Sequence, residues 1–167
     1  MPSQTFDNLS HEKQIRIQKA LLDEFSHYSL AEAQVARIVK EAKIARGAFY
    51  KYFADLTDAY QYEFKMVMRE IHRPLKGGQT KLSPNAILTM ISDFINESEN
   101  AHVREFVTLY YQKNRYLLSP SQAELELSGS KWGVSILIHQ TIRDILLQPQ
   151  QQPFFLRRLK ENLEKLS

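Results

Sequence analysis

Apolar residues recur at helical spacing along most of the chain, and short polar segments separate the periodic stretches. In the first stretch a single apolar stripe runs from Ile17 to Tyr28, at positions i, i+3, i+4, i+8 and i+11. Later stretches repeat this spacing, and one of them opens with Ser83-Pro84, a pair typical of a helix start. The pattern predicts helices at about residues 10–28, 34–42, 45–52, 56–73, from 84, 103–118, 131–148 and 153–166. We therefore expect an all-α protein.

Composition narrows the class of protein without naming a function. The 167 residues are 43% hydrophobic and 25% charged, as in ordinary globular proteins, and only five are glycine. Cysteine is absent, which excludes disulfides, thiolate metal sites and a cysteine nucleophile. The first residues lack the pattern of a signal peptide, and no apolar run reaches the length of a membrane span. We expect a cytoplasmic protein.

Positive charge is concentrated in one short segment. Residues 34–52 hold five cations and one anion, a local charge of +4, whereas the whole chain carries +3. Such a concentration is typical of a surface that binds a polyanion. A solvated basic face with no partner would give the same pattern, so charge alone leaves both readings open.

The same segment has the organisation of a helix-turn-helix. Helices at 34–42 and 45–52 would be joined by Lys43-Ile44, and Phe49 and Phe53 would hold the second helix to the core, one turn apart. The opposite face of that helix would then be exposed, and a single helix fits the DNA major groove. The residues predicted on this face are Ala45, Arg46, Gly47, Ala48, Lys51 and Tyr52.

Residues 17–53 resemble the N-terminal domain of the tetracycline-repressor-like (TetR) family. The first helix carries Ile17-Gln-Lys-Ala-Leu-Leu-Asp-Glu-Phe25, and the second part closes with Arg46-Gly-Ala-Phe-Tyr-Lys-Tyr-Phe53, as in the family's pattern. The resemblance implies a DNA-binding domain at 1–54 and a helical effector-binding and dimerisation domain at 55–167. It also implies DNA contacts by the residues Gln34, Lys43, Ala45, Arg46, Gly47, Ala48, Tyr50, Lys51 and Tyr52.

Roles within that set also follow from the resemblance. Arg46 and Gly47 would approach base edges, and Gln34 would touch the DNA backbone. Tyr50, Lys51 and Tyr52 would contact phosphates or thymine methyl groups.

Four positions depart from the family's pattern. Lys43 stands where the family has a turn glycine, which relieves a positive φ. Ala33 and Ala45 replace hydroxyl residues that cap the two helices, each cap being worth about 1 kcal/mol. Leu56 replaces a lysine that contacts phosphate. Weaker DNA binding, or a positive contribution shifted to Lys43, would follow.

The last two helices carry more apolar surface than a small monomer needs. The helix at 131–148 has two apolar stripes, which predicts burial on more than one face. Either it forms a dimer interface with 153–166, or it is a central helix covered within one chain. The residues predicted at a dimer interface are Trp132, Ile136, Ile138, Ile142, Ile145, Phe155, Leu159 and Leu163.

Ring-bearing residues are frequent in the C-terminal part. The resemblance implies an effector pocket between helices there, whereas the plain alternative is core packing. The residues assigned to this pocket are Phe94, Phe106, Tyr110, Tyr111, Trp132 and His139.

Motifs for catalysis or metal binding do not stand out. No His-x-x-x-His pair occurs, and no glycine-rich phosphate loop or Gly-x-Ser-x-Gly elbow is present. We expect no cofactor, no metal and no enzymatic activity. The sequence predicts a regulator, most simply a repressor, that binds a pseudo-palindromic operator as a homodimer and is released by a small-molecule effector. A TetR-like protein that acts through a protein partner, and an unrecognised enzyme, are the alternatives.

Overall fold

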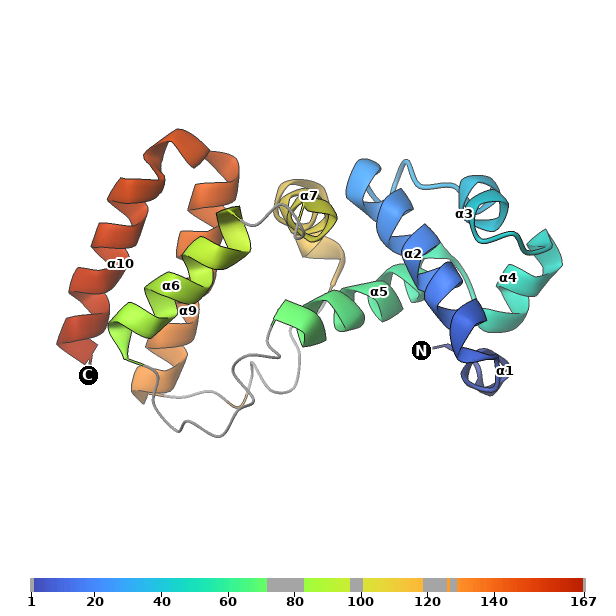
Figure 1. The fold of residues 1–167 in the computed structure, drawn as a ribbon, viewed down its shortest axis with the longest axis horizontal. Coiled ribbons are helices and arrows are strands. Elements are labelled where there is room, and N and C mark those ends of the chain that lie inside the picture. Colours follow the sequence, from blue (N-terminus) through green and yellow to red (C-terminus); the bar gives the residue numbers. More distant parts are fainter. Residues whose placement is uncertain (1, 72–82, 97–100, 119–125, 127–128, 167) are drawn as a thin grey trace. The chain divides into compact units, whose positions relative to one another are not determined.

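The computed structural model describes residues 2–71, 83–96, 101–118, 126 and 129–166, and within these ranges it contains helices and no strand (Figure 1). The predicted all-α class is confirmed. The α-helices are α1 (Gln4–Asp7), α2 (His11–His27), α3 (Val35–Glu41), α4 (Arg46–Tyr52), α5 (Leu56–Ile71), α6 (Pro84–Asn96), α7 (Ala101–Leu109), α9 (Gly129–Leu147) and α10 (Gln152–Leu166). The π-helical segment η3 (Tyr110–Asn114) and the 3-10 segments η4 (Arg115–Leu117) and η5 (Pro149–Gln151) complete them.

The chain divides into two compact units. The first comprises Met1–Gly77 and Ala101–Arg115, and the second comprises Gly78–Asn100 and Tyr116–Ser167. The first unit therefore contains α5 and α7 as well as the predicted helix-turn-helix. The domain boundary expected after residue 54 stays a prediction, because these units follow packing rather than function.

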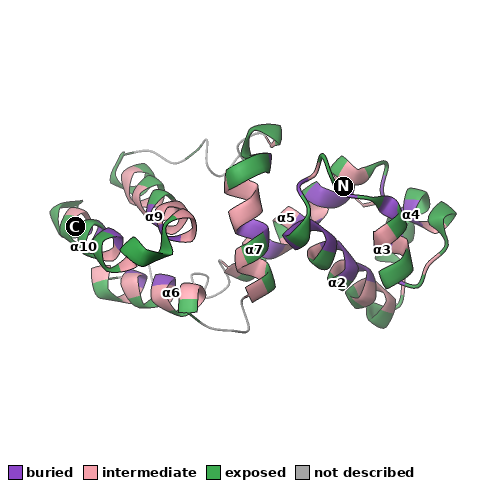
Figure 2. Ribbon diagram, turned by 90° about the horizontal axis from the view of Figure 1, so that it is seen from above, coloured by how far each residue is buried: buried purple, intermediate pink, exposed green. Residues whose placement is uncertain are grey.

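The core of the first unit is built around α2. Its predicted stripe is confirmed from Ile17 to Phe25, where its residues are buried, whereas Tyr28 at the end of the predicted stripe is 39% exposed. Figure 2 shows such buried positions alternating with exposed ones along the helices. The sequence pattern missed the α-helix α1, whose four residues form a turn with Phe6 buried against Phe53, the ring centroids being 5.3 Å apart. A single apolar residue in a four-residue helix gives no periodicity to detect.

Aromatic rings connect α5 to α7 and η3. The ring of Tyr60 stacks on Phe106 at 5.3 Å, and the rings of Phe64 and Tyr110 lie 4.7 Å apart. Asn114, which is buried at the end of η3, accepts a hydrogen bond at 3.1 Å from the backbone N–H of Leu30. These contacts fasten η3 and α7 to the first unit.

The second unit packs α10 against α6 and α9 around one apolar cluster. The buried members of this cluster are Ile87, Ile91, Ile145, Phe155, Leu159 and Leu163. The prediction that Ile145, Phe155, Leu159 and Leu163 form a dimer interface is therefore corrected: these side chains fill the unit's own core. They carried the right hydrophobic period, which does not say whether the covering surface belongs to the same chain.

Other predicted interface residues lie closer to the surface. Ile138 and Ile142 are partly buried against the same cluster, whereas Trp132 and Ile136 are 53% and 47% exposed. Since Trp132 and Ile136 are one turn apart on α9, they form an exposed apolar pair on one face of that helix.

A buried carboxyl group lies on α5. Glu63 is on the buried face of α5 with Ala59 and Val67, and its Oε2 accepts no hydrogen bond within the described residues. Burial raises the pKa of Glu63 from 4.5 to about 8, because the charged form loses its hydration. The group is thus protonated in the folded chain near neutral pH.

This burial predicts a pH dependence of stability. Between pH 4.5 and about 8 the folded chain holds a proton on Glu63 that the unfolded chain has lost, so stability falls as pH rises through this window. Glu63→Gln should flatten the slope, removing a loss of roughly 1–3 kcal/mol across the window. Urea unfolding at several pH values measures it. Glu70→Gln, an exposed position on the same helix, is the control and should keep the slope. An unchanged slope in Glu63→Gln would contradict the assignment.

Candidate DNA-binding surface

The turn between α3 and α4 closes with a Schellman motif. The N–H of Lys43 donates to the carbonyl of Lys40 at 3.3 Å, and the N–H of Ile44 donates to that of Val39 at 3.0 Å. The residue that must turn left-handed in this motif is Lys43, with φ of 52°. The motif commonly has glycine there, so Lys43 adopts the turn that the family's glycine would adopt, at a cost of about 1 kcal/mol.

The start of α3 is held by a side chain from α2. No side chain of the flanking residue Gln34 caps this helix, but Glu24 Oε1 accepts a hydrogen bond from the Gln34 N–H at 2.7 Å. At the other end, Arg16 Nε donates to the carbonyl of Ala42 at 2.8 Å. The cap that Ala33 does not provide is thus replaced by a carboxylate ten residues earlier in sequence. Local capping rules could not find it.

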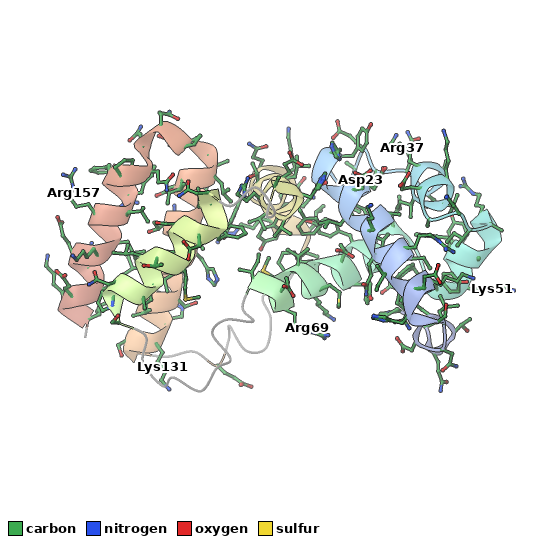
Figure 3. All side chains as sticks on the ribbon, viewed as in Figure 1. Asp23, Arg37, Lys51, Arg69, Lys131 and Arg157 are labelled. Carbon is green, nitrogen blue, oxygen red and sulfur yellow. The ribbon has the colours of Figure 1, made fainter. Side chains whose placement is uncertain are left out.

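Arg37 contributes less free charge than the sequence suggested. Its guanidinium donates to both oxygens of Glu24, with Nη2 and Oε1 2.6 Å apart, and it lies 3.7 Å above the ring centroid of Tyr28. Hydrogen bonding to Glu24 raises the pKa of Arg37. Figure 3 marks Arg37 near α2, on the α3 side. The exposed cations of the segment are Lys40, Lys43, Arg46 and Lys51.

One face of α4 is buried and the other is exposed. Phe49 is fully buried and Phe53, just after the helix, is nearly so, as predicted. The outer face of α4, which we define as Arg46, Gly47, Tyr50 and Lys51, is exposed, and Ala48 beside it is half-buried. Figure 3 shows Lys51 directed away from the ribbon core.

Tyr52 is not on that outer face. Its side chain is 5% exposed, and its ring meets the edge of Phe6 at 5.9 Å, so the prediction of an exposed Tyr52 is wrong. The error has one cause, namely that α1 was not predicted and its Phe6 covers the ring. The other predicted contact residues Gln34, Lys43 and Ala45 are exposed.

The C-terminal end of α4 is fixed by polar contacts. Ser3 Oγ donates to the carbonyl of Lys51 at 2.5 Å, and the Ser3 N–H donates to that of Tyr52 at 2.8 Å. The following helix α5 begins after Asp55, whose Oδ1 accepts the N–H of Asp58 at 2.7 Å. These contacts satisfy backbone groups at both ends of the short 52–56 connection. Leu56 offers no charge there, as the sequence indicated.

Neither the backbone conformation nor the packing of the chain requires glycine at position 47. Its φ is not left-handed, and a Cβ built on it would meet no atom within 4 Å. The open space beside Gly47 lies on the outer face of α4, where an approaching partner rather than the protein itself would use it.

The residues assigned to an effector pocket fall into both units. Phe106, Tyr110 and Tyr111 belong to the first unit, and Phe106 is fully buried in the stack on Tyr60. Its packing is that of a core residue. The remaining three, Phe94, Trp132 and His139, belong to the second unit. The pocket as a whole stays a prediction.

Among the helical segments that the structure describes, none combines the length and hydropathy needed to cross a bilayer.

Two short helices, a tight turn and an exposed basic helix face define a helix-turn-helix protein. Residues 17–55 match the sequence model of the bacterial regulatory proteins of the tetR family. Solved TetR-family structures share the fold over nearly the whole chain. The resemblance predicted from the sequence is confirmed for residues 17–55, and over the rest of the chain the likeness to TetR-family structures is one of fold.

Three solved structures illustrate the likeness. A TetR family transcriptional regulator from Chloroflexus aurantiacus is 19% identical with a TM-score of 0.52, covering 99% of this chain and 96% of its own. A TetR family member from Streptomyces coelicolor is 14% identical with a TM-score of 0.68, covering 93% and 98%. NalD of Pseudomonas aeruginosa, the secondary repressor of the MexAB-OprM multidrug efflux pump, is 13% identical with a TM-score of 0.57, covering 94% and 97%. No curated protein matches the chain in sequence.

A substitution at Gly47 tests whether this glycine serves the fold. Gly47→Ala should raise the free energy of unfolding by about 0.5–1 kcal/mol, because alanine is the better helix former and finds open space. Urea unfolding followed by circular dichroism measures it. Gly133→Ala within α9, where the new Cβ would lie at an ordinary 3.8 Å from Leu166, is the matched control and should also stabilise. A destabilised Gly47→Ala would mean that the glycine has a role inside the fold.

Proposed function

We propose that the chain is a cytoplasmic repressor, with no enzymatic activity, that binds a pseudo-palindromic operator as a homodimer. The observation that carries the proposal is the outer face of α4. It combines a guanidinium, an ammonium group and a side-chain-free position on a helix that is anchored by buried phenylalanines.

Each residue of that face has a chemical role in the proposal. Arg46 forms paired hydrogen bonds with a guanine edge, and Gly47 lets the helix backbone approach the bases. Tyr50 and Lys51 bind phosphates, assisted at the rim by Gln34, Lys43, Ala45 and Ala48. The Arg46 guanidinium lies 6.0 Å from the ring centroid of Tyr50, a distance at which the two side chains can limit each other's freedom before binding.

A twofold dimer accounts for the pseudo-palindromic symmetry of the proposed operator. Two copies of α4 would enter successive major grooves about 34 Å apart, which requires a twofold dimer. The exposed apolar pair Trp132 and Ile136 on α9 supports an interface there. Release by a small molecule bound in the C-terminal helices would follow from its different affinities for two separations of the α4 helices. The repressor NalD, which shares the fold, supports repression as the output.

DNA binding is tested with operators selected by the purified chain from random duplexes. Arg46→Ala should weaken the selected site by about 1–3 kcal/mol and relax preference at one base pair. Lys51→Ala should weaken all sequences alike and lower the salt slope by about 1. Gly47→Ala should lose affinity although the fold is stabilised, since its methyl group would stand between helix and bases.

Arg157→Ala and Lys160→Ala are the charge-matched controls, because both positions are exposed on α10 in the second unit. They should leave affinity unchanged. Absence of any sequence-specific binding at low salt would refute the proposal and favour action through a protein partner.

The dimer is tested by placing charge on the apolar pair. Trp132→Glu with Ile136→Glu should sediment as a single chain and bind the full operator at least tenfold more weakly, because a lone reading helix contacts one half-site. The control is Tyr116→Glu with Leu117→Glu, which adds the same two negative charges at positions 82% and 42% exposed outside α9. If the double variant sediments like the unmodified chain, α9 is not the interface.

A further inference from the structure

A second group of polar side chains lies away from the outer face of α4. Asp23 and His27 are one turn apart on α2, and His102 lies near the start of α7. One ligand-type atom from each of the three lies within 4.8 Å of the others. Since α7 packs along α2, residues distant in sequence are brought together. Figure 3 marks Asp23 on α2.

The imidazole rings of His27 and His102 lie close together, with centroids 5.9 Å apart and planes inclined at 56°. Nδ1 of His27 lies 2.7 Å from the backbone carbonyl oxygen of Asp23 and 3.7 Å from Oδ1 of the same residue. Because the carbonyl oxygen can only accept, Nδ1 carries the proton and Nε2 keeps a free lone pair. Nδ1 of His102 lies 3.5 Å from Oε2 of Glu105. An imidazole whose Nδ1–H faces a carbonyl or carboxylate oxygen is the usual arrangement of a metal-bound histidine.

We infer that Asp23, His27 and His102 form a binding site for a divalent transition metal, best matched by Zn²⁺. Two imidazole nitrogens and one carboxylate oxygen are the donors that Zn²⁺ takes in three-ligand sites, with water in the fourth position. Calcium and magnesium prefer all-oxygen ligands and fit this set less well. The sequence did not predict it, because two of its ligands are joined only by the packing of α7 on α2.

The charges around the hollow beside Asp23 and His27 are of both signs. The hollow beside Asp23 and His27 is also lined by Arg37, whose charge is paired with Glu24 at 2.6 Å. Lys40 lines it too, together with the carboxylate of Glu41. All three proposed ligands are exposed, so a hydrated ion can reach them without any rearrangement of the core.

A bound ion would fasten α7 to α2, the helix against which α3 packs. The three ligands come together only in the folded chain, so the ion would bind the folded state and not the unfolded state. Binding would therefore raise the free energy of unfolding as the metal concentration rises. The site does not depend on the proposed function, because its occupancy can be measured without DNA. Failure of operator binding and failure of metal binding are therefore separate results.

The test uses the full chain, free of any histidine tag and stripped with a chelator, titrated with ZnCl₂ in a calorimeter. We expect one Zn²⁺ per chain and a melting temperature that rises with zinc concentration. His27→Gln and His102→Gln should each weaken binding at least tenfold and remove the thermal shift. The control His11→Gln, an exposed position on α2 outside the cluster, should bind as the unmodified chain does.

A second measurement needs no variant. Zinc added to the ¹⁵N-labelled chain should shift the ring nitrogen resonances of His27 and His102 and leave those of His11 and His139 in place. No saturable zinc binding, or equal binding by the His27→Gln and His102→Gln variants, would overturn the site. So would shifts confined to other histidines.

Discussion

The burial of Phe49 and Phe53 is the interaction on which the candidate site depends. Both rings are excluded from water, and they sit one turn apart at the end of a seven-residue helix. A helix this short is not stable alone, so its orientation is set by what it buries. Removing one such ring typically costs about 3–5 kcal/mol. Because these rings hold one face of α4 in the core, the opposite face, which carries Arg46 and Lys51, lies at the surface.

Hydrogen bonds from outside α3 and α4 also hold these two helices in place. Glu24 holds the start of α3, Arg16 holds its end, and Ser3 holds the end of α4. Each of these three side chains lies outside both α3 and α4. Short helices leave many backbone groups unsatisfied relative to their length, and here side chains from α2 and the N-terminal segment satisfy several of them. Helix α4 is thus part of a hydrogen-bonded assembly and not an independent unit.

The sequence predicted the structure best where helical periodicity alone determines which residues are buried. Helical period located α2 to α10 and the burial of Ile17, Phe25 and Phe49, since one buried face imposes one spacing. It failed where a contact joins distant segments. Phe6 on Tyr52, Glu24 at the start of α3 and the approach of His102 to His27 have no local signature. Leu159 and Leu163 were placed in an interface for a related reason: periodicity reports that a face is covered but not by what.

Two residues, one on either side of α4, lower the stability of the fold, and they do so in different ways. Lys43 accepts a left-handed backbone just before α4, and Glu63 accepts burial without a partner for Oε2 on the helix after it. Glycine at position 43 would relieve the first cost but would also remove an exposed positive charge from the turn beside the outer face of α4. Strain that coincides with a useful charge is expected where a surface serves binding as well as folding. Glu63, by contrast, is buried and cannot contact a partner molecule. Its burial only destabilises the core of the first unit and makes the stability of that core depend on pH.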